Sequence, residues 1–261
     1  MGKTTIPTIV IDIEYVIIYR VEVKLKVELL SYNQNIIDII HTACRTCYSK
    51  SSPIDIYDED ANLECEEKKL NLIKKVMDSG HLSTTEHAYF TFAIEGVSRA
   101  LLAQITRHRL CSFSVQSQRY VEIKENLDDL IVLKTCGTKY DKTLLLNKYF
   151  VLECDDGLFI DSYLDSLIKY LLLTRSGYKA EDARNVLPQA TKTNMVLSCN
   201  LRELMHICNL RLCKHAQLEV RTMVKKMKEE VIKREECKWL NKYLVPNCKN
   251  CTDFRDCKGI K

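Results

Sequence analysis

Glycine is scarce in this chain, and the scarcity limits the folds that are open to it. Only 7 of the 261 residues are glycine, and none is arranged as G-x-G-x-x-G or G-x-x-x-x-G-K-[ST]. Those loops let backbone amides cradle phosphate groups in the common dinucleotide- and triphosphate-binding folds. If this chain binds a nucleotide, side chains and helix ends must therefore make the contacts.

The hydrophobic pattern combines the period of strands with that of helices. Apolar residues alternate from Ile9 to Leu29 and over residues 88–94, and residues 191–199 also look extended. Helical spacing recurs along the chain, at residues 36–43, 70–77, 98–105, 160–175 and 180–186, with a variable stretch near 124–157. Because strands and helices do not alternate strictly, we expect an α+β fold.

Capping residues mark several helix ends. Gly80 and Ser98 can cap two of these helices, and Asn200, with Glu203 three residues later, begins a third. That third helix should be long, because apolar residues four apart form one stripe along it, at Leu204, Cys208, Leu212, Ala216, Val220 and Val224. Residues 53–66 are acidic and rich in turn-forming residues, which indicates a loop.

The composition is typical of a globular protein, with 46% hydrophobic and 28% charged residues. A chain of this length can bury roughly three-quarters of its extended surface. The sequence has no apolar run of 18 residues and no secretory signal pattern, and its 13 cysteines are odd in number and scattered. We therefore expect a reduced, cytoplasmic protein without a membrane partner. The net charge of +4 is too small for a general nucleic-acid binder.

Residues 96–120 contain no aspartate or glutamate, although they are rich in cationic side chains. The cationic and potentially cationic residues are Arg99, Arg107, His108, Arg109 and Arg119. Guanidinium groups with nearby serine and glutamine side chains suit a phosphate or a pyrimidine carbonyl. A solvated basic face would have the same composition, but the usual acidic partners four residues away are missing. The segment therefore favours an anion-binding site.

A second polar cluster lies on the helix expected to begin at Asn200. At about 100° per residue, its polar side chains divide into two faces, with Arg202, His206 and Gln217 on one and Asn200, Arg211 and His215 on the other. One helix would then serve two places, which is natural in an oligomer whose sites lie between subunits. Two ordinary surface faces beside a buried stripe remain the alternative.

Metal-binding patterns are weak in this sequence. Two histidines and a glutamate lie within residues 81–87, but their spacing is not H-E-x-x-H, which favours a polar ligand contact or a cap. In the tail, Cys248-x-x-Cys251 has half of a zinc-ribbon spacing, with Cys237 and Cys257 at irregular intervals. We expect free thiols there, with a metal site at Cys248 and Cys251 as the lesser alternative.

Residues 107–120 contain the string R-H-R-x7-S-x-R-Y, which resembles the signature of the flavin-dependent thymidylate synthases. Further similarities to that family follow in the right order, at residues 43–49, 80–92, 183–188, 200–204 and 210–217. The resemblance extends from about Val23 to Val231. It divides the chain into an extension over residues 1–22, a synthase domain over 23–235 and a cysteine-containing tail over 236–261.

The resemblance implies a homotetramer of single-domain α+β chains, with helices packed on a mainly antiparallel sheet and FAD bound between subunits. It also implies methylation of dUMP to dTMP, with the carbon from methylenetetrahydrofolate and electrons from NADPH. Reduced flavin would add hydride to the pyrimidine, so no cysteine nucleophile is needed. This agrees with the sequence, which contains no Cys-His-Asn arrangement and no Pro-Cys-His element.

The resemblance also assigns roles to individual residues. Those that match dUMP-binding positions are Gln104, Arg107, Ser117, Arg119, Arg184 and Arg211. Arg211 would also be the catalytic residue, stabilising negative charge that develops on the uracil ring. Those that match FAD-binding positions are Ser83, Glu86, Arg107, His108, Arg109, Asn200, Arg202, His206 and His215. His81 matches a histidine near the flavin and the folate.

Two positions depart from the pattern of the family. Many members have an acidic residue two positions before the signature serine, where this chain has Val115, so Gln116 or the backbone must take over that role. His206 stands where asparagine is common. Two other functions therefore stay open, a non-catalytic phosphate- or RNA-binding module and an inactive family member. The modest net charge and the lack of paired exposed aromatics argue against the first.

Overall fold

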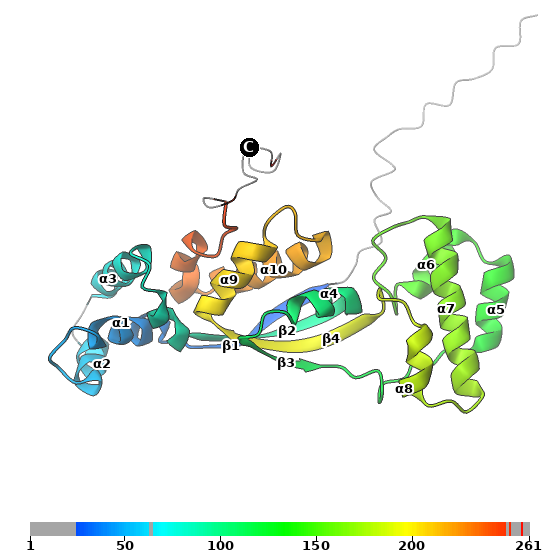
Figure 1. The fold of residues 1–261 in the computed structure, drawn as a ribbon, viewed down its shortest axis with the longest axis horizontal. Helices are drawn as coiled ribbons and strands as arrows, with labels where there is room; N and C mark the ends of the chain where they lie inside the picture. The colour runs from blue at the N-terminus through cyan, green and yellow to red at the C-terminus, as the bar shows by residue number, and fades with distance from the viewer. Residues whose placement is uncertain (1–24, 63–64, 249–250, 252–256, 258–261) are drawn as a thin grey trace, which may run out of the picture.

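A four-stranded antiparallel sheet lies at the centre of this computed structural model, which describes residues 25–62, 65–248, 251 and 257 (Figure 1). The strand order is β1-β2-β4-β3, and each neighbouring pair is antiparallel. The strands are β1 (Lys26–Tyr32), β2 (Tyr89–Ser98), β3 (Cys111–Val115) and β4 (Lys192–Asn200). The expected strand from Ile9 is described only from Lys26 onward, because residues 1–24 lie outside the described part.

Alternation in β2 and β4 gives the sheet one buried and one open face. Phe90 and Phe92 of β2 are fully buried, and Leu197 of β4 lies beside Phe92 in the register. The intervening Tyr89 and Val196 are exposed on the opposite face. The helices α4 (Arg99–Ile105), α9 (Leu201–Arg211) and α10 (Leu218–Ile232) cover the buried face (Figure 1). The strands expected over 88–94 and 191–199 are therefore confirmed.

Helical groups extend the molecule at the two ends of the sheet (Figure 1). One end carries α1 (Ile36–Thr46), α2 (Pro53–Asn62), α3 (Glu66–Asp78) and the 3-10 helix Leu82–His87. The other carries α5 (Leu127–Cys136), α6 (Lys139–Leu146), α7 (Gly157–Arg175), α8 (Ala180–Ala183) and the 3-10 helix Arg184–Val186. This second group has a core of its own, which includes Leu130, Leu164 and Tyr170. The α+β fold class is confirmed, and so are the expected helices over 36–43, 70–77, 98–105, 160–175 and 180–186.

The loop expected over residues 53–66 is wrong, because residues 53–62 form α2. Its start carries a reciprocal cap, in which the Asp55 N–H donates to Ser52 Oγ at 3.1 Å and the Ser52 N–H donates to Asp55 Oδ2 at 3.4 Å. Pro53 occupies the first helical position, where its missing N–H costs nothing. Ile56 is fully buried and anchors the helix, while the acidic residues near it stay at the surface.

The variable stretch near residues 124–157 contains two helices with capped starts. Asn126 Oδ1 accepts from the Asp128 N–H at 3.0 Å at the start of α5. Thr138 and Asp141 cap each other reciprocally at the start of α6. Both helices pack against α7, which supplies the apolar surface that their short sequences need.

The long helix expected from Asn200 is also wrong, because it divides into α9 and α10 around an irregular segment, 212–217. The apolar stripe continues, since Leu204, Cys208, Val220 and Val224 are all buried in one core. The break serves polar contacts instead, because it lets the Gln217 side chain reach Gln104 and the Glu219 carboxylate reach Ser98. His215 and Gln217 therefore do not share a helix with His206, and the inference of one helix with two polar faces fails.

The chain after α10 continues into the 3-10 helix Glu235–Lys242. Cys237 and Leu240 of this helix are buried in the core beneath the sheet. Cys237 is therefore a core residue, separate from the cysteines that follow it. Among the described residues, no helix is long and apolar enough to cross a membrane.

Candidate active site

The start of α4 is fixed by a buried carboxylate. Ser98 Oγ accepts from the Leu101 N–H at 2.9 Å, as expected for an N-cap. The Ser98 N–H in turn donates to Glu219 Oε1 at 2.7 Å, and its hydroxyl donates to the other carboxylate oxygen. Burial raises the pKa of Glu219, and its bonds to Ser98 oppose that change. This anchor sets the direction of α4 and of the arginine-rich turn that follows it.

That turn places its three signature residues in different environments. Arg107 and Arg109 are exposed, whereas His108 between them is buried. The backbone N–H of His108 donates to the Ile105 carbonyl at 3.0 Å, which closes the turn directly after α4. The two guanidinium groups therefore remain at the surface, and the imidazole ring points inward.

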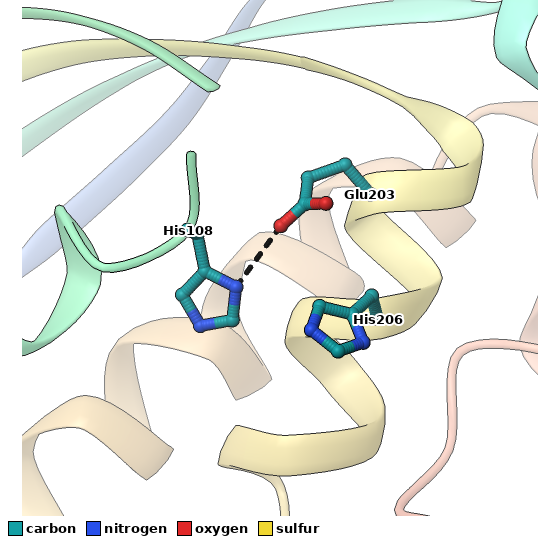
Figure 2. Close-up of side chains that lie close together, drawn as sticks. All are labelled: His108, Glu203 and His206. Carbon is teal, nitrogen blue, oxygen red and sulfur yellow. Dashed lines mark hydrogen bonds and ion pairs between the residues drawn. The ribbon is translucent and has the colours of Figure 1, made fainter. Parts of the chain in front are cut away.

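The buried imidazole links α9 to the turn through a chain of hydrogen bonds. Figure 2 shows the His108 ring facing the Glu203 carboxylate, with His206 further along α9; His108 Nδ1 lies 3.0 Å from Glu203 Oε1. Arg211 Nε donates to His108 Nε2 at 3.2 Å. Since a guanidinium can only donate, Nε2 must accept, and the ring proton belongs on Nδ1, where it donates to Glu203. Glu203 thus fixes the tautomer that Arg211 requires.

Arg211 is held at a second point by the end of α4. Its Nη2 donates to the Gln104 carbonyl at 3.1 Å, while the Gln104 side chain donates to Gln217. Arg211 is only half-buried, so part of its side chain is accessible to solvent. The predicted residues Gln104, His108 and Arg211 are therefore brought together.

Electrostatics keep the His108 ring neutral. Burial lowers its pKa most, and the charges of Arg211 and His206 lower it further, against the opposing effect of Glu203. A neutral ring is the form that can accept from Arg211. The geometry and the electrostatics therefore agree on the same protonation state.

The same cluster resembles a metal centre by distance alone. Ligand atoms of His108, Glu203 and His206 all lie within 4.8 Å of one another, the one such group among the described residues. Both nitrogens of His108 are engaged, however, and the partner of Nε2 is the cationic Arg211. A metal ion would have to displace a guanidinium group, so we assign the cluster as a hydrogen-bond chain.

A second group of predicted residues lines a separate cavity. Ser117 and Arg184 face a hollow of about 460 Å³ together with Gln116, Lys192 and Asn194. Asn194 Nδ2 donates to Gln116 Oε1 at 3.1 Å, so the residue after Val115 is tied to β4. Val115 itself ends β3 opposite Met195.

Arg184 also lines a neighbouring hollow of about 500 Å³, together with Arg99. Burial lowers the pKa of Arg99, and the adjacent Arg184 guanidinium lowers it further. Arg184 Nε donates to the Glu181 carbonyl at 3.1 Å, whereas the Glu181 carboxylate pairs with Arg119 Nε at 2.9 Å. Two guanidinium groups thus face each other across a site suited to an anion.

Helix α4 separates the two groups. Its residues Leu102, Ala103 and Thr106 line the hollow beside Arg184, while Gln104 contacts Arg211. At about 100° per residue, the Gln104 side chain, which donates to Gln217, projects away from Leu102 and Thr106, while its backbone carbonyl accepts from Arg211. Within one chain, therefore, Arg184 and Arg211 contact different sides of α4.

Most of the remaining predicted residues lie around the start of α9, whereas His215 lies beyond its end in segment 212–217. Asn200 Oδ1 accepts from the Glu203 N–H at 2.9 Å, which confirms the expected cap. Arg202 forms an ion pair with Glu86 of the 3-10 helix Leu82–His87. Ser83 lines an apolar hollow of about 630 Å³ between α1, α2 and that 3-10 helix. His81 and His215 are exposed.

Two residues of these groups were missing from the predicted site. Glu203 was interpreted only as part of a capping box, but its side chain binds His108 rather than the backbone of Asn200. Arg99 lies in the carboxylate-free segment and was given no role. The sequence signal for Glu203 was its position on the apolar side of the helix, next to Leu204 and four residues before Ile207. A carboxylate buried there needs a partner.

Comparisons with known proteins agree with this arrangement. The family described as thymidylate synthase complementing protein matches residues 28–235. A flavin-dependent thymidylate synthase of Pyrococcus abyssi is 40% identical over 179 residues, which are 67% of this chain and 68% of that protein. One from Haloarcula marismortui is 38% identical over 222 residues, which are 78% of this chain and 89% of that protein.

The fold has solved counterparts. A crystal structure of thymidylate synthase X from Helicobacter pylori with FAD and dUMP superposes with a TM-score of 0.67 at 24% identity, covering 85% of this chain and 99% of that one. At that identity the likeness concerns the fold alone. The match over residues 28–235 and the two relatives go further, and the resemblance inferred from the arginine-rich signature is confirmed: the chain belongs to the family of flavin-dependent thymidylate synthases.

Proposed function

We propose that this chain catalyses the reductive methylation of dUMP to dTMP, with FAD as its cofactor and with methylenetetrahydrofolate and NADPH as co-substrates. Membership of the family carries this proposal, together with the hydrogen-bond chain that positions Arg211. A non-catalytic phosphate- or RNA-binding module is disfavoured, because such a module has no use for a buried, oriented imidazole behind one arginine.

The free state of all thirteen cysteines suits the reducing cytoplasm, where we place the enzyme.

The cavity beside Arg99 and Arg184 is our candidate for the dUMP phosphate. Burial and the adjacent Arg184 guanidinium lower the pKa of Arg99, and a phosphate dianion between the two groups would relieve that repulsion. Ser117 and Gln116 line the adjoining hollow, which Arg184 also faces, and offer hydroxyl and amide groups for the remaining phosphate or base oxygens. Gln116 in this role would replace the acidic residue that many members of the family have at the position of Val115.

Arg211 is our candidate for stabilising the pyrimidine as it gains negative charge. Two of its N–H groups are committed to His108 and Gln104, which leaves the others oriented toward a ligand. A donor held in place before the reaction costs no reorganisation when charge develops. Neutral His108, oriented by Glu203, is what holds it.

The residues present fit FAD at the surface rather than in a glycine-rich loop. Arg107 and Arg109 are exposed on either side of His108 and suit the flavin pyrophosphate, and the Arg202–Glu86 pair lies at the start of α9. When bound, FAD supplies the hydride that reduces the pyrimidine. Cysteine chemistry is not required, and burial raises the pKa of the Cys208 thiol to about 12, which makes that residue inert.

We propose a homotetramer, and the separation of the two groups supports association of chains. Arg184 and Arg211 cannot serve one substrate within a single chain, because α4 lies between them. A complete site therefore needs Arg211 from one subunit beside Arg184 from another. The open face of the sheet, with Tyr89 and Val196 exposed, offers a surface for that association.

The visible absorption spectrum tests the proposal most directly. The purified protein should show oxidised flavin absorption that shifts when dUMP is added, because the substrate then contacts the cofactor. It should form dTMP only when methylenetetrahydrofolate and NADPH are both present. Colourless protein that also fails to take up added FAD would contradict the cofactor assignment, and flavin binding without rescue of a thymidine auxotroph would identify an inactive family member.

A further inference from the structure

Four cysteines lie near one another where the C-terminal tail approaches the end of α9. Cys213 follows two residues after Arg211, in the irregular segment 212–217. The tail approaches the same place, because the Asn247 N–H donates to the Asn209 carbonyl of α9 at 3.2 Å. Cys248 is the next residue, so its side chain lies near Cys213.

The tail around Cys248 has the local form of a metal-binding turn. The Cys251 N–H donates to the Cys248 carbonyl at 3.4 Å, and the Cys248 N–H donates to the Pro246 carbonyl at 2.8 Å. Closing C-x-x-C by such a turn directs both thiols to the same side, as in zinc sites with this spacing. Cys257 follows six residues after Cys251.

Burial separates these four cysteines from Cys237. Cys213, Cys248, Cys251 and Cys257 are all partly buried and free. Cys237, which the sequence grouped with the tail, is instead fully enclosed in the core among apolar residues. The cluster therefore exchanges Cys237 for Cys213, a residue that lies far from the tail in the sequence.

The four thiols also act on one another electrostatically. Burial raises the pKa of Cys248, and negative charge at Cys213, Cys251 and Cys257 raises it further. The three other cysteines are therefore near enough to Cys248 to interact with its sulfur. A divalent metal ion reverses the balance, because it lowers the pKa of every thiol that it binds.

We propose that Cys213, Cys248, Cys251 and Cys257 form a structural zinc site that fastens the tail to the segment between α9 and α10. Four thiolates make a closed tetrahedral set, which is typical of structural rather than catalytic zinc. Binding one Zn²⁺ releases the four thiol protons and changes no oxidation state. Among the described residues no three of these sulfurs lie within 4.8 Å of one another, so binding would draw the four side chains closer together.

The site lies beside the catalytic group without belonging to it. Segment 212–217 also holds His215 and Gln217, and Gln217 is bonded to Gln104. Zinc would thus hold segment 212–217 near its start, at Cys213, whereas Gln217 at its end contacts α4. Its presence is measured by metal content and is independent of the proposed synthase activity.

Metal analysis of the full chain, purified under reducing conditions without chelator, tests the site. We expect stoichiometric zinc in the wild type and in Cys136→Ser, a matched variant of an exposed cysteine on α5. Cys248→Ser and Cys213→Ser should each lose the zinc. Cobalt substituted into the wild type should give the intense thiolate-to-metal and visible d–d bands of a tetrahedral site.

The wild type alone provides a second measurement if the variants fail to fold. Stepwise blocking of its thiols with a mercurial should release zinc in proportion, as detected with a metal-sensitive dye. Wild-type protein that contains no zinc and binds no cobalt would overturn the proposal. So would a disulfide between any two of the four cysteines, iron with inorganic sulfide in place of zinc, or zinc retained by both variants.

Discussion

At the scale of single residues, orientation distinguishes Arg211 from the other arginines of the site. His108 and Gln104 hold its guanidinium at two points. Arg107 and Arg109, by contrast, extend from the surface of their turn. A fixed donor serves a transition state, whereas mobile cations serve the binding of a charged ligand. The two kinds of arginine should therefore respond differently to substitution.

We expect Arg211→Ala to lower kcat about 10²–10³-fold while leaving bound flavin largely in place. The loss falls on turnover because the contact strengthens only as charge develops on the ring. Steady-state kinetics and the flavin absorbance per chain measure both effects. Arg175→Ala, which removes an exposed arginine at the end of α7, is the matched control. Complete loss of FAD without another defect would assign Arg211 to cofactor retention instead.

Glu203→Gln separates the orientation of His108 from its presence. The amide can donate to Nδ1, which would move the ring proton to Nε2 and turn the acceptor for Arg211 into a donor. We expect kcat to fall roughly ten-fold, the size of one charged hydrogen bond. Because Glu203 raises the pKa of His108, the acidic limb of the pH–rate profile should also move to lower pH. A purely structural role would lower stability and leave that limb where it is.

The depressed pKa of His108 also predicts how stability depends on pH. Its folded-state pKa lies below the ordinary value of 6.5, so the unfolded chain binds this proton more tightly. The neutral ring contributes its full stability above pH 6.5, and that contribution is lost as the pH falls from 6.5 toward the folded-state pKa. Denaturant unfolding at several pH values should show a smaller loss in His108→Gln. An identical slope in both proteins would mean that the ring titrates normally.

At the scale of elements, capping side chains decide where the helices begin. Asn200 ends β4 and begins α9 at the same residue, so it sets where Glu203 and Arg211 lie relative to the sheet. Ser98 does the same between β2 and α4, with Glu219 behind it. Because β2 and β4 are antiparallel, the two functional helices start at opposite ends of the sheet, and their last turns come together where Arg211 donates to the Gln104 carbonyl.

We expect Asn200→Ala to lower the free energy of unfolding by about 1 kcal/mol, the usual cost of a lost N-cap. Its bond to the Glu203 N–H is the contact removed. Chemical denaturation measures the change, and Asn241→Ala, an exposed asparagine in the last 3-10 helix, is the control. An unchanged free energy of unfolding would mean that sheet packing alone fixes the start of α9.

At the scale of the whole molecule, α4 divides two groups that one substrate must use together. Arg184 lies with Arg99 on one side and Arg211 lies with His108 on the other. Under the proposed function, association of chains would unite them, and the exposed face of the sheet with Tyr89 and Val196 is a candidate surface for it. The division of the site is therefore itself an argument for the oligomer.

Mixing two inactive variants tests that argument. Arg184→Ala and Arg211→Ala should each be inactive alone, but chains reassembled or expressed together should recover part of the activity. Recovery is expected because some sites in a mixed oligomer combine an intact Arg184 with an intact Arg211 from another chain. If the mixture stays inactive although mixed oligomers are present, both residues come from the same subunit.

The two failed expectations have different causes. The sequence predicted one helix from Asn200 to Val224, because the apolar stripe continues through residues that the structure leaves irregular. No glycine or proline marks the break, since it is set by the contacts of Gln217 and Glu219 with α4. The missed helix at residues 53–62 did carry local signals, the Ser52–Asp55 cap and Pro53, which its acidic composition outweighed.

Local chemistry in the sequence determined the family, the α+β class, the strands that alternate and the caps that begin α4 and α9. These features depend on neighbours within a few residues, so they can be read without knowing the fold. Tertiary structure alone decided that Glu203 orients His108, that Arg99 faces Arg184, and that Cys213 rather than Cys237 joins the tail cysteines. Each pairs residues distant in the chain, and which distant groups meet is settled by the packing of the helices on the sheet.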